Sequence, residues 1–73
     1  MMYLGWFDDT PKKSTSAKIE EAVAAYIDRF KTKPNVVIVN EVDRMEVEGV
    51  LVRSEHYMVR NNFWVGWEDM AKI

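Results

Sequence analysis

Apolar residues change their spacing along this chain at Pro34. Before the proline they recur three and four positions apart, which predicts a helix over residues 17–30 with one buried face. After the proline, Val36–Val39 is a run of β-branched residues, which predicts a strand covered on both faces or nearly so. The helical stripe consists of Ile19, Ala22, Val23, Tyr26, Ile27 and Phe30.

The polar residues of the helical segment set its limits. Ser14 or Thr15 is favoured as the N-cap over Thr10, because the apolar period begins only after Ser16. Pro34 prevents any continuation of the helix. The polar face is expected to carry most of Lys18, Glu20, Glu21, Asp28 and Arg29.

Three further segments have strand character: residues 2–7, 50–53 and 63–67. A single helical turn is expected around Val42 and Met45, a short extended piece at 57–59, a turn at 61–62 and a frayed tail at 68–73. The predicted fold class is α+β, or small α/β. It has a three- to four-stranded mixed sheet with one main helix on one face, in the order β-α-β-β-β.

This order suggests a topology. If the first two strands are parallel neighbours, the helix is the crossover between them, and the last two strands pair antiparallel at one edge. The second face of the sheet is then wet, covered by the tail, or buried against a second copy. Within the last strand, Phe63, Val65 and Trp67 are expected on one face and Trp64 on the other.

The length and composition narrow the class of protein. Seventy-three residues make one small domain, 1–73, whose core is marginal unless it packs densely or has a partner. Without cysteine, disulfides and thiolate metal sites are excluded, and one histidine cannot hold a structural zinc alone. A net charge of −2 argues against duplex DNA binding. We expect a cytoplasmic chain with no membrane span and no secretory signal.

Three residues are candidates for chemistry: Asp8, Asp9 and His56. Paired carboxylates after a strand can bind Mg²⁺ or transfer protons, and a histidine beside acids can act as a base, so a minimal metal-dependent enzyme is one alternative. Adjacent side chains on an extended strand point to opposite faces, however, so ordinary turn and surface roles are favoured. No catalytic residue, metal or cofactor is assigned.

Three tryptophans, with three tyrosines and three phenylalanines, are a heavy aromatic load for this length. Trp6, Trp64 and Trp67 are therefore the candidate interface residues, and we expect a non-enzymatic interaction or oligomerisation module. Its partner is a second copy, as a homodimer, or another protein. With Arg53, Arg60, Lys12 and Lys13 the same rings also fit a weak single-stranded nucleic-acid surface, which the acidic balance disfavours.

Four segments together resemble a family of short uncharacterised bacterial α/β proteins: residues 5–9, 18–30, 34–40 and 63–66. No activity is assigned to that family, so the resemblance implies no site residue. Residues 35–66 are also similar to part of the axial domain of tailed-phage capsid proteins. This chain is far too short to be such a capsid protein, and the second resemblance implies an assembly context at most.

Overall fold

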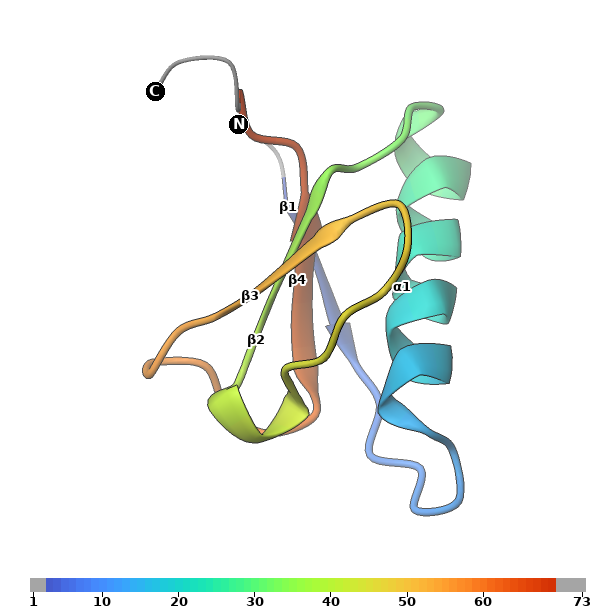
Figure 1. The fold of residues 1–73 in the computed structure, drawn as a ribbon. Coiled ribbons are helices and arrows are strands. Elements are labelled where there is room, and N and C mark those ends of the chain that lie inside the picture. The colour runs from blue at the N-terminus through green and yellow to red at the C-terminus, as the bar shows by residue number, and fades with distance from the viewer. Residues whose placement is uncertain (1–2, 70–73) are drawn as a thin grey trace.

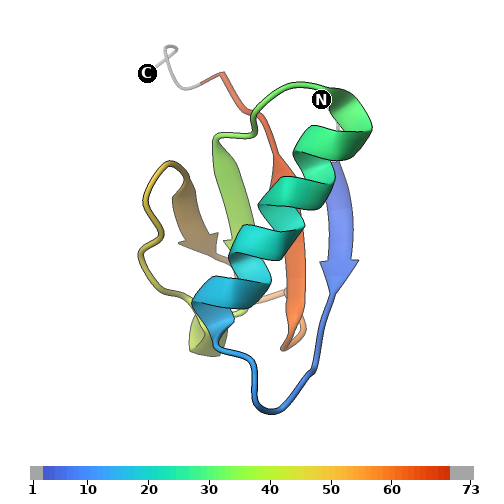
Figure 2. The same ribbon diagram turned by 90° about the vertical axis from the view of Figure 1, so that its right-hand side faces the viewer.

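The structure, a computed structural model, describes residues 3–69 and has the predicted order β-α-β-β-β. One long helix lies against one face of a four-stranded mixed sheet, which confirms the predicted fold class (Figure 1). A quarter turn of the same ribbon shows α1 crossing in front of the sheet (Figure 2). The elements are β1 (Tyr3–Phe7), α1 (Thr15–Phe30), β2 (Val36–Val39), the 3₁₀ turn η1 (Glu41–Asp43), β3 (Leu51–Ser54) and β4 (Asn62–Gly66).

The strand order in the sheet is β1-β4-β2-β3. β4 runs antiparallel to both β1 and β2, whereas β2 and β3 are parallel. The expectation that the first two strands are neighbours is therefore wrong, and so is the expected pairing of the last two. β4 supplies the fully buried Phe63 and Val65, which belong under the helix, while β3 carries an exposed Leu51 that suits an edge.

The ends of α1 follow from local chemistry. The Ser14 hydroxyl accepts a hydrogen bond from the Ala17 N–H at 3.2 Å, which confirms the later helix start. At the other end, Lys31 adopts a left-handed conformation (φ 59°) and its N–H donates to the Ile27 carbonyl at 2.8 Å. This cap ends the helix at Phe30, before Pro34 is reached.

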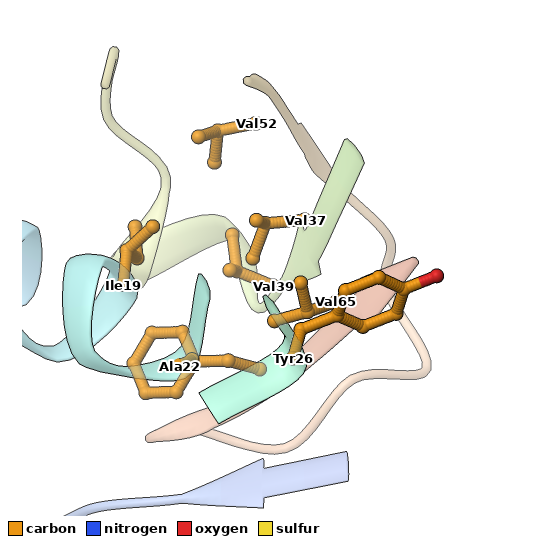
Figure 3. Close-up of a cluster of buried hydrophobic side chains, with 8 residues drawn as sticks. Ile19, Ala22, Tyr26, Val37, Val39, Val52 and Val65 are labelled. Atoms are coloured by element: carbon orange, nitrogen blue, oxygen red, sulfur yellow. The ribbon is translucent and has the colours of Figure 1, made fainter. Parts of the chain in front are cut away.

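The main core lies between α1 and the sheet. Figure 3 shows Ile19, Ala22 and Tyr26 from the helix meeting valines of three strands. Ile27, predicted in the same stripe, is 37% exposed at its margin. Lys18 lies on the opposite side from the one predicted, because it is buried and its Nζ donates to Asn61 Oδ1 at 3.2 Å.

β2 is covered on both faces, as its β-branched run predicted. Val37 and Val39 face α1, whereas Val36 and Ile38 pack against Met58 on the other side. Met58 belongs to the connection between β3 and β4, which lies away from α1 (Figure 1). Residues 57–59 are part of this loop, so the short extended piece expected there does not form.

The remaining local predictions are refined by the structure. η1 provides a helical turn that includes Val42 but ends at Asp43, before Met45, and Asn61 has the positive φ (65°) expected of the turn before β4. Asn62 already belongs to the strand. The first strand is described from Tyr3 onward, and Met2 lies outside the described residues.

Gly66 is required by the packing of Tyr3 on the helix-free face. The two residues are cross-strand partners, and a Cβ at position 66 would overlap the Tyr3 ring. Gly5 is different, because a Cβ there would lie 4.0 Å from Trp64 Nε1, an ordinary contact distance. One glycine of the sheet is therefore sterically fixed and the other is not.

We predict that Gly66→Ala lowers the free energy of unfolding by about 1–3 kcal/mol, because the ring must move out of its place. Gly5→Ala is the matched control and is neutral or stabilising by up to about 1 kcal/mol, because a glycine inside a strand is less stable than an alanine. Urea unfolding of both variants measures the difference. Equal losses in the two variants would contradict the packing of Tyr3 on Gly66.

Candidate functional site

The helix-free face of the sheet has a covered half and an open half. The covered half is closed by a set of hydrogen-bonded groups that we call the polar latch: Tyr3, Asn35, Arg53 and Glu68. Arg53 donates from Nη1 and Nη2 to the two carboxylate oxygens of Glu68, at 2.9 and 3.0 Å. The Tyr3 hydroxyl donates to the same carboxylate. The latch therefore connects β1 and β3, the two edge strands, across the face.

Asn35 fixes the backbone of Glu68. Its Nδ2 donates to the Glu68 carbonyl at 2.6 Å, and the Glu68 N–H donates to Asn35 Oδ1 at 2.8 Å. Fraying was expected from residue 68 onward, and the structure shows that Glu68 is anchored. Residues 70–73 of the expected tail lie outside the described residues.

The electrostatics of the latch match its geometry. Burial, followed by the hydrogen bond to Glu68, raises the pKa of Tyr3 to about 12. The hydrogen bonds from Arg53 and then from Tyr3 lower the pKa of Glu68. At neutral pH the latch is thus a neutral phenol on an ionised carboxylate–guanidinium pair, and none of these groups is poised to exchange a proton.

The open half lies over the later part of β1 and its partner in β4. It consists of Gly5, Phe7 and Trp64, which we call the aromatic margin. Phe7 is 62% exposed and Trp64 44% exposed. The Trp64 indole extends over Gly5, its cross-strand partner, where its Nε1 is 4.0 Å from the position of an added Cβ. Its ring also contacts that of Tyr3, at 6.4 Å between centroids. The margin therefore adjoins the latch.

The three tryptophans proposed as interface residues do not share one surface. Trp6 pairs with Phe63 across the strands and packs against the core on the helix side, opposite to Trp64. Its Nε1 is enclosed without a hydrogen-bond partner among the described residues. Trp67 follows β4 and is 49% exposed. Alternation along strands separates Trp6 from Trp64, and only Trp64 belongs to the aromatic margin.

The candidate acids and the histidine are not brought together. Asp8 and Asp9 follow β1, whereas His56 follows β3 at the opposite edge, three strand spacings or about 14 Å away. Within residues 3–69, no group of three or more acidic or histidine side chains is placed to hold a metal ion. His56 is exposed and contacts Tyr57 edge to face, at 5.9 Å between ring centroids.

Asp8 contacts residues of the loop that follows it. It accepts hydrogen bonds from the Thr10 N–H and hydroxyl and forms an ion pair with Lys13 Nζ at 3.1 Å. These contacts, with the Thr10 hydroxyl first, lower the pKa of Asp8 to about 2. Lys13 also pairs with Glu21 of α1 at 2.8 Å. Asp8 thus fastens the loop before the helix, while its neighbour Asp9 is exposed.

The most buried carboxylate among the described residues is Asp43, which the sequence did not single out. It is 3% exposed and accepts a 2.7 Å hydrogen bond from the Asn61 N–H. Arg60 Nε lies 3.4 Å from its other oxygen. Asp43 therefore holds the left-handed turn that leads into β4. The polar segment around it gave no signal of burial, because its partner lies 18 residues further along the chain.

No family model, no curated protein and no solved structure matches this chain. The resemblances stated from the sequence therefore stay predictions. As for membranes, none of the helices within residues 3–69 has the length and apolar character needed to span one.

We predict that the Tyr3 hydroxyl makes stability fall at high pH. The unfolded pKa is about 10 and the folded pKa about 12, so the folded state holds this proton more tightly. Its contribution is complete below pH 10 and is lost as pH rises through 12. Because lysines titrate in the same range, the measurement is the difference between wild type and Tyr3→Phe in urea unfolding at several pH values. A difference that does not change above about pH 10 would contradict this.

We also predict that Asp43→Ala lowers the free energy of unfolding by about 1–3 kcal/mol, because it leaves the Asn61 N–H without its acceptor. Asp9→Ala, at an exposed position, changes it by less than about 0.5 kcal/mol. Thermal or urea unfolding of both variants makes the comparison. Similar values for the two would show that the buried carboxylate does not hold the turn.

Proposed function

We propose that this protein is a non-enzymatic interaction module that associates with a second copy of itself through the aromatic margin. The observation that carries the proposal is the half-open face of the sheet, where Phe7 and Trp64 remain exposed beside Gly5. Large aromatic side chains are enriched at protein interfaces and dominate their energetics. Their grouping on the one face that α1 does not cover supports association there.

The state of the polar groups supports a binding role over an enzymatic one. The carboxylates of Asp8, Asp43 and Glu68 are each engaged by neighbouring donors within the chain. Candidate acids and the histidine lie at opposite edges of the sheet. We therefore place the function in the apolar surface and not in a catalytic group.

Nucleic-acid binding has less support, because three of its four candidate cations are paired with carboxylates, among them Lys13 with Asp8 and Glu21. Arg53 is paired with Glu55 and Glu68, and Arg60 lies beside the buried Asp43. Phosphate contacts require cations that are available to exchange their counterions. Before they could bind phosphate, these two arginines would have to break their ion pairs with carboxylates of the same chain.

We predict reversible self-association of the wild-type chain in sedimentation velocity from micromolar to millimolar concentration. Trp64→Lys weakens it by about tenfold or more, because a charge replaces a central aromatic ring. Trp67→Lys is the matched control, since Trp67 is similarly exposed but lies outside the margin, and it leaves association within about threefold.

Two outcomes would count against the proposal. A wild-type chain that sediments as a monomer at every concentration would remove self-association. Equal effects of the two lysine variants would remove the aromatic margin as its site. Quenching of tryptophan fluorescence by a single-stranded oligonucleotide, reversed by salt, would favour the nucleic-acid alternative instead.

A further inference from the structure

β1 is an edge strand, and within residues 3–69 it carries none of the charges or prolines that usually protect an edge. Its sequence, Tyr-Leu-Gly-Trp-Phe, has no charge, no proline and a high content of aromatic residues. Natural proteins shield such edges with charges, prolines, bulges or covering segments. The opposite edge, β3, carries Arg53, and residues 44–48 and 50 line a pocket together with its Leu51 and Val52. Of the two edge strands, β1 is therefore the one more open to pairing with another strand.

The backbone of β1 presents Gly5 to this edge. Hydrogen-bonded pairs alternate along an antiparallel ladder, and the Asp8 N–H bonds the Asn61 carbonyl at 3.0 Å just beyond the strands. In the observed register the inward residues of β1 are then Leu4 and Trp6. The N–H and C=O of Gly5 and Phe7 point away from β4, toward the open edge.

We infer that two copies pair antiparallel through β1, in a register centred on Gly5. The inference rests on the proposed self-association and specifies its geometry. Gly5 and the partner's Gly5 exchange two N–H···O=C bonds across the two-fold axis, and Phe7 lies opposite the partner's Tyr3. The two four-stranded sheets become one continuous sheet, with both helices on the same face.

This register also accounts for the position of Trp64. Its Cα and that of the partner's Trp64 are separated by three strand spacings, about 14 Å. Each indole extends toward β1 over a glycine, so the two rings approach each other above the paired Gly5 residues. A side chain at position 5 would fill the space between them. The absence of one leaves a shared notch for two indoles.

A second copy is the occupant that the charges favour. β1 is uncharged, so bringing two of them together creates no like-charge contact within the strands. The nearest acid, Asp8, already has Lys13 as its counterion. Because edge pairing of two such short strands buries less than a standard interface, we expect a dimer with a micromolar or weaker dissociation constant.

The test uses Gly5→Cys, which introduces the only thiol of the chain at a position with room for it. Paired Cα atoms in this register are about 5.5 Å apart, within the range of a disulfide. In a glutathione buffer the variant forms a covalent dimer at least about tenfold faster than Ala24→Cys, an exposed control on α1. Gly5→Ser, which cannot cross-link, is checked for unchanged folding by circular dichroism.

Amide hydrogen exchange of the wild-type chain tests the same register without a mutation. Protection of the Gly5 and Phe7 amides rises with protein concentration, whereas the inward Leu4 and Trp6 amides are protected throughout. If the wild type associates but the Gly5 amide stays unprotected and the two cysteine variants cross-link equally, β1 pairing is wrong while the proposed function stands. If the wild type remains a monomer, both the β1 pairing and the proposed self-association are wrong.

Discussion

One helix can cover only one face of a sheet, and this chain has a strand that needs both faces covered. The four residues of β2 are all buried, with Val37 and Val39 under α1 and Val36 and Ile38 on the other side. Burying them is the main favourable contribution available to a core of this size. The chain therefore uses short pieces of itself to cover the second face. Met58 from the β3–β4 connection covers its centre, and Tyr3 lies across Gly66.

The polar latch covers one end of that second face with hydrogen-bonded groups. A guanidinium and a phenol both donate to one carboxylate over the sheet, and Asn35 fixes the backbone of Glu68. Such a network stabilises only when every member has a partner. It covers the face from one edge strand to the other with polar groups in place of apolar side chains. It also defines where coverage ends, because beyond Tyr3 the face continues as the aromatic margin, exposed at Phe7 and Trp64.

The proposed binding role rests on the incomplete coverage of the sheet and not on a constellation of reactive groups. Three carboxylates, the candidate Asp8 among them, are used for structure, whereas the candidate Asp9 is exposed. Asp8 fastens the loop before α1, Asp43 holds the turn before β4, and Glu68 closes the latch. The aromatic margin is continuous with β1, an uncharged edge strand. The proposed partner, a second copy of the chain, would use both features, because its β1 would extend the sheet and its indole would lie over the paired Gly5 residues.

The sequence by itself determined the elements, since these depend on neighbours along the chain. The period of the Ile19–Phe30 stripe, the choice of Ser14 or Thr15 as cap and the β-branched run of β2 predicted α1, its later start and a doubly covered strand. Each was confirmed, with Ser14 as the cap and Ile27 at the exposed margin of the stripe. The tertiary structure alone decided the order of the strands, the burial of Lys18 and Asp43, and the separation of Trp6 from Trp64. These features depend on which strand lies beside which and on partners far away in the sequence, such as Tyr3 with Glu68. No local pattern records such pairings, because long-range contacts are chosen by the packing of the whole chain.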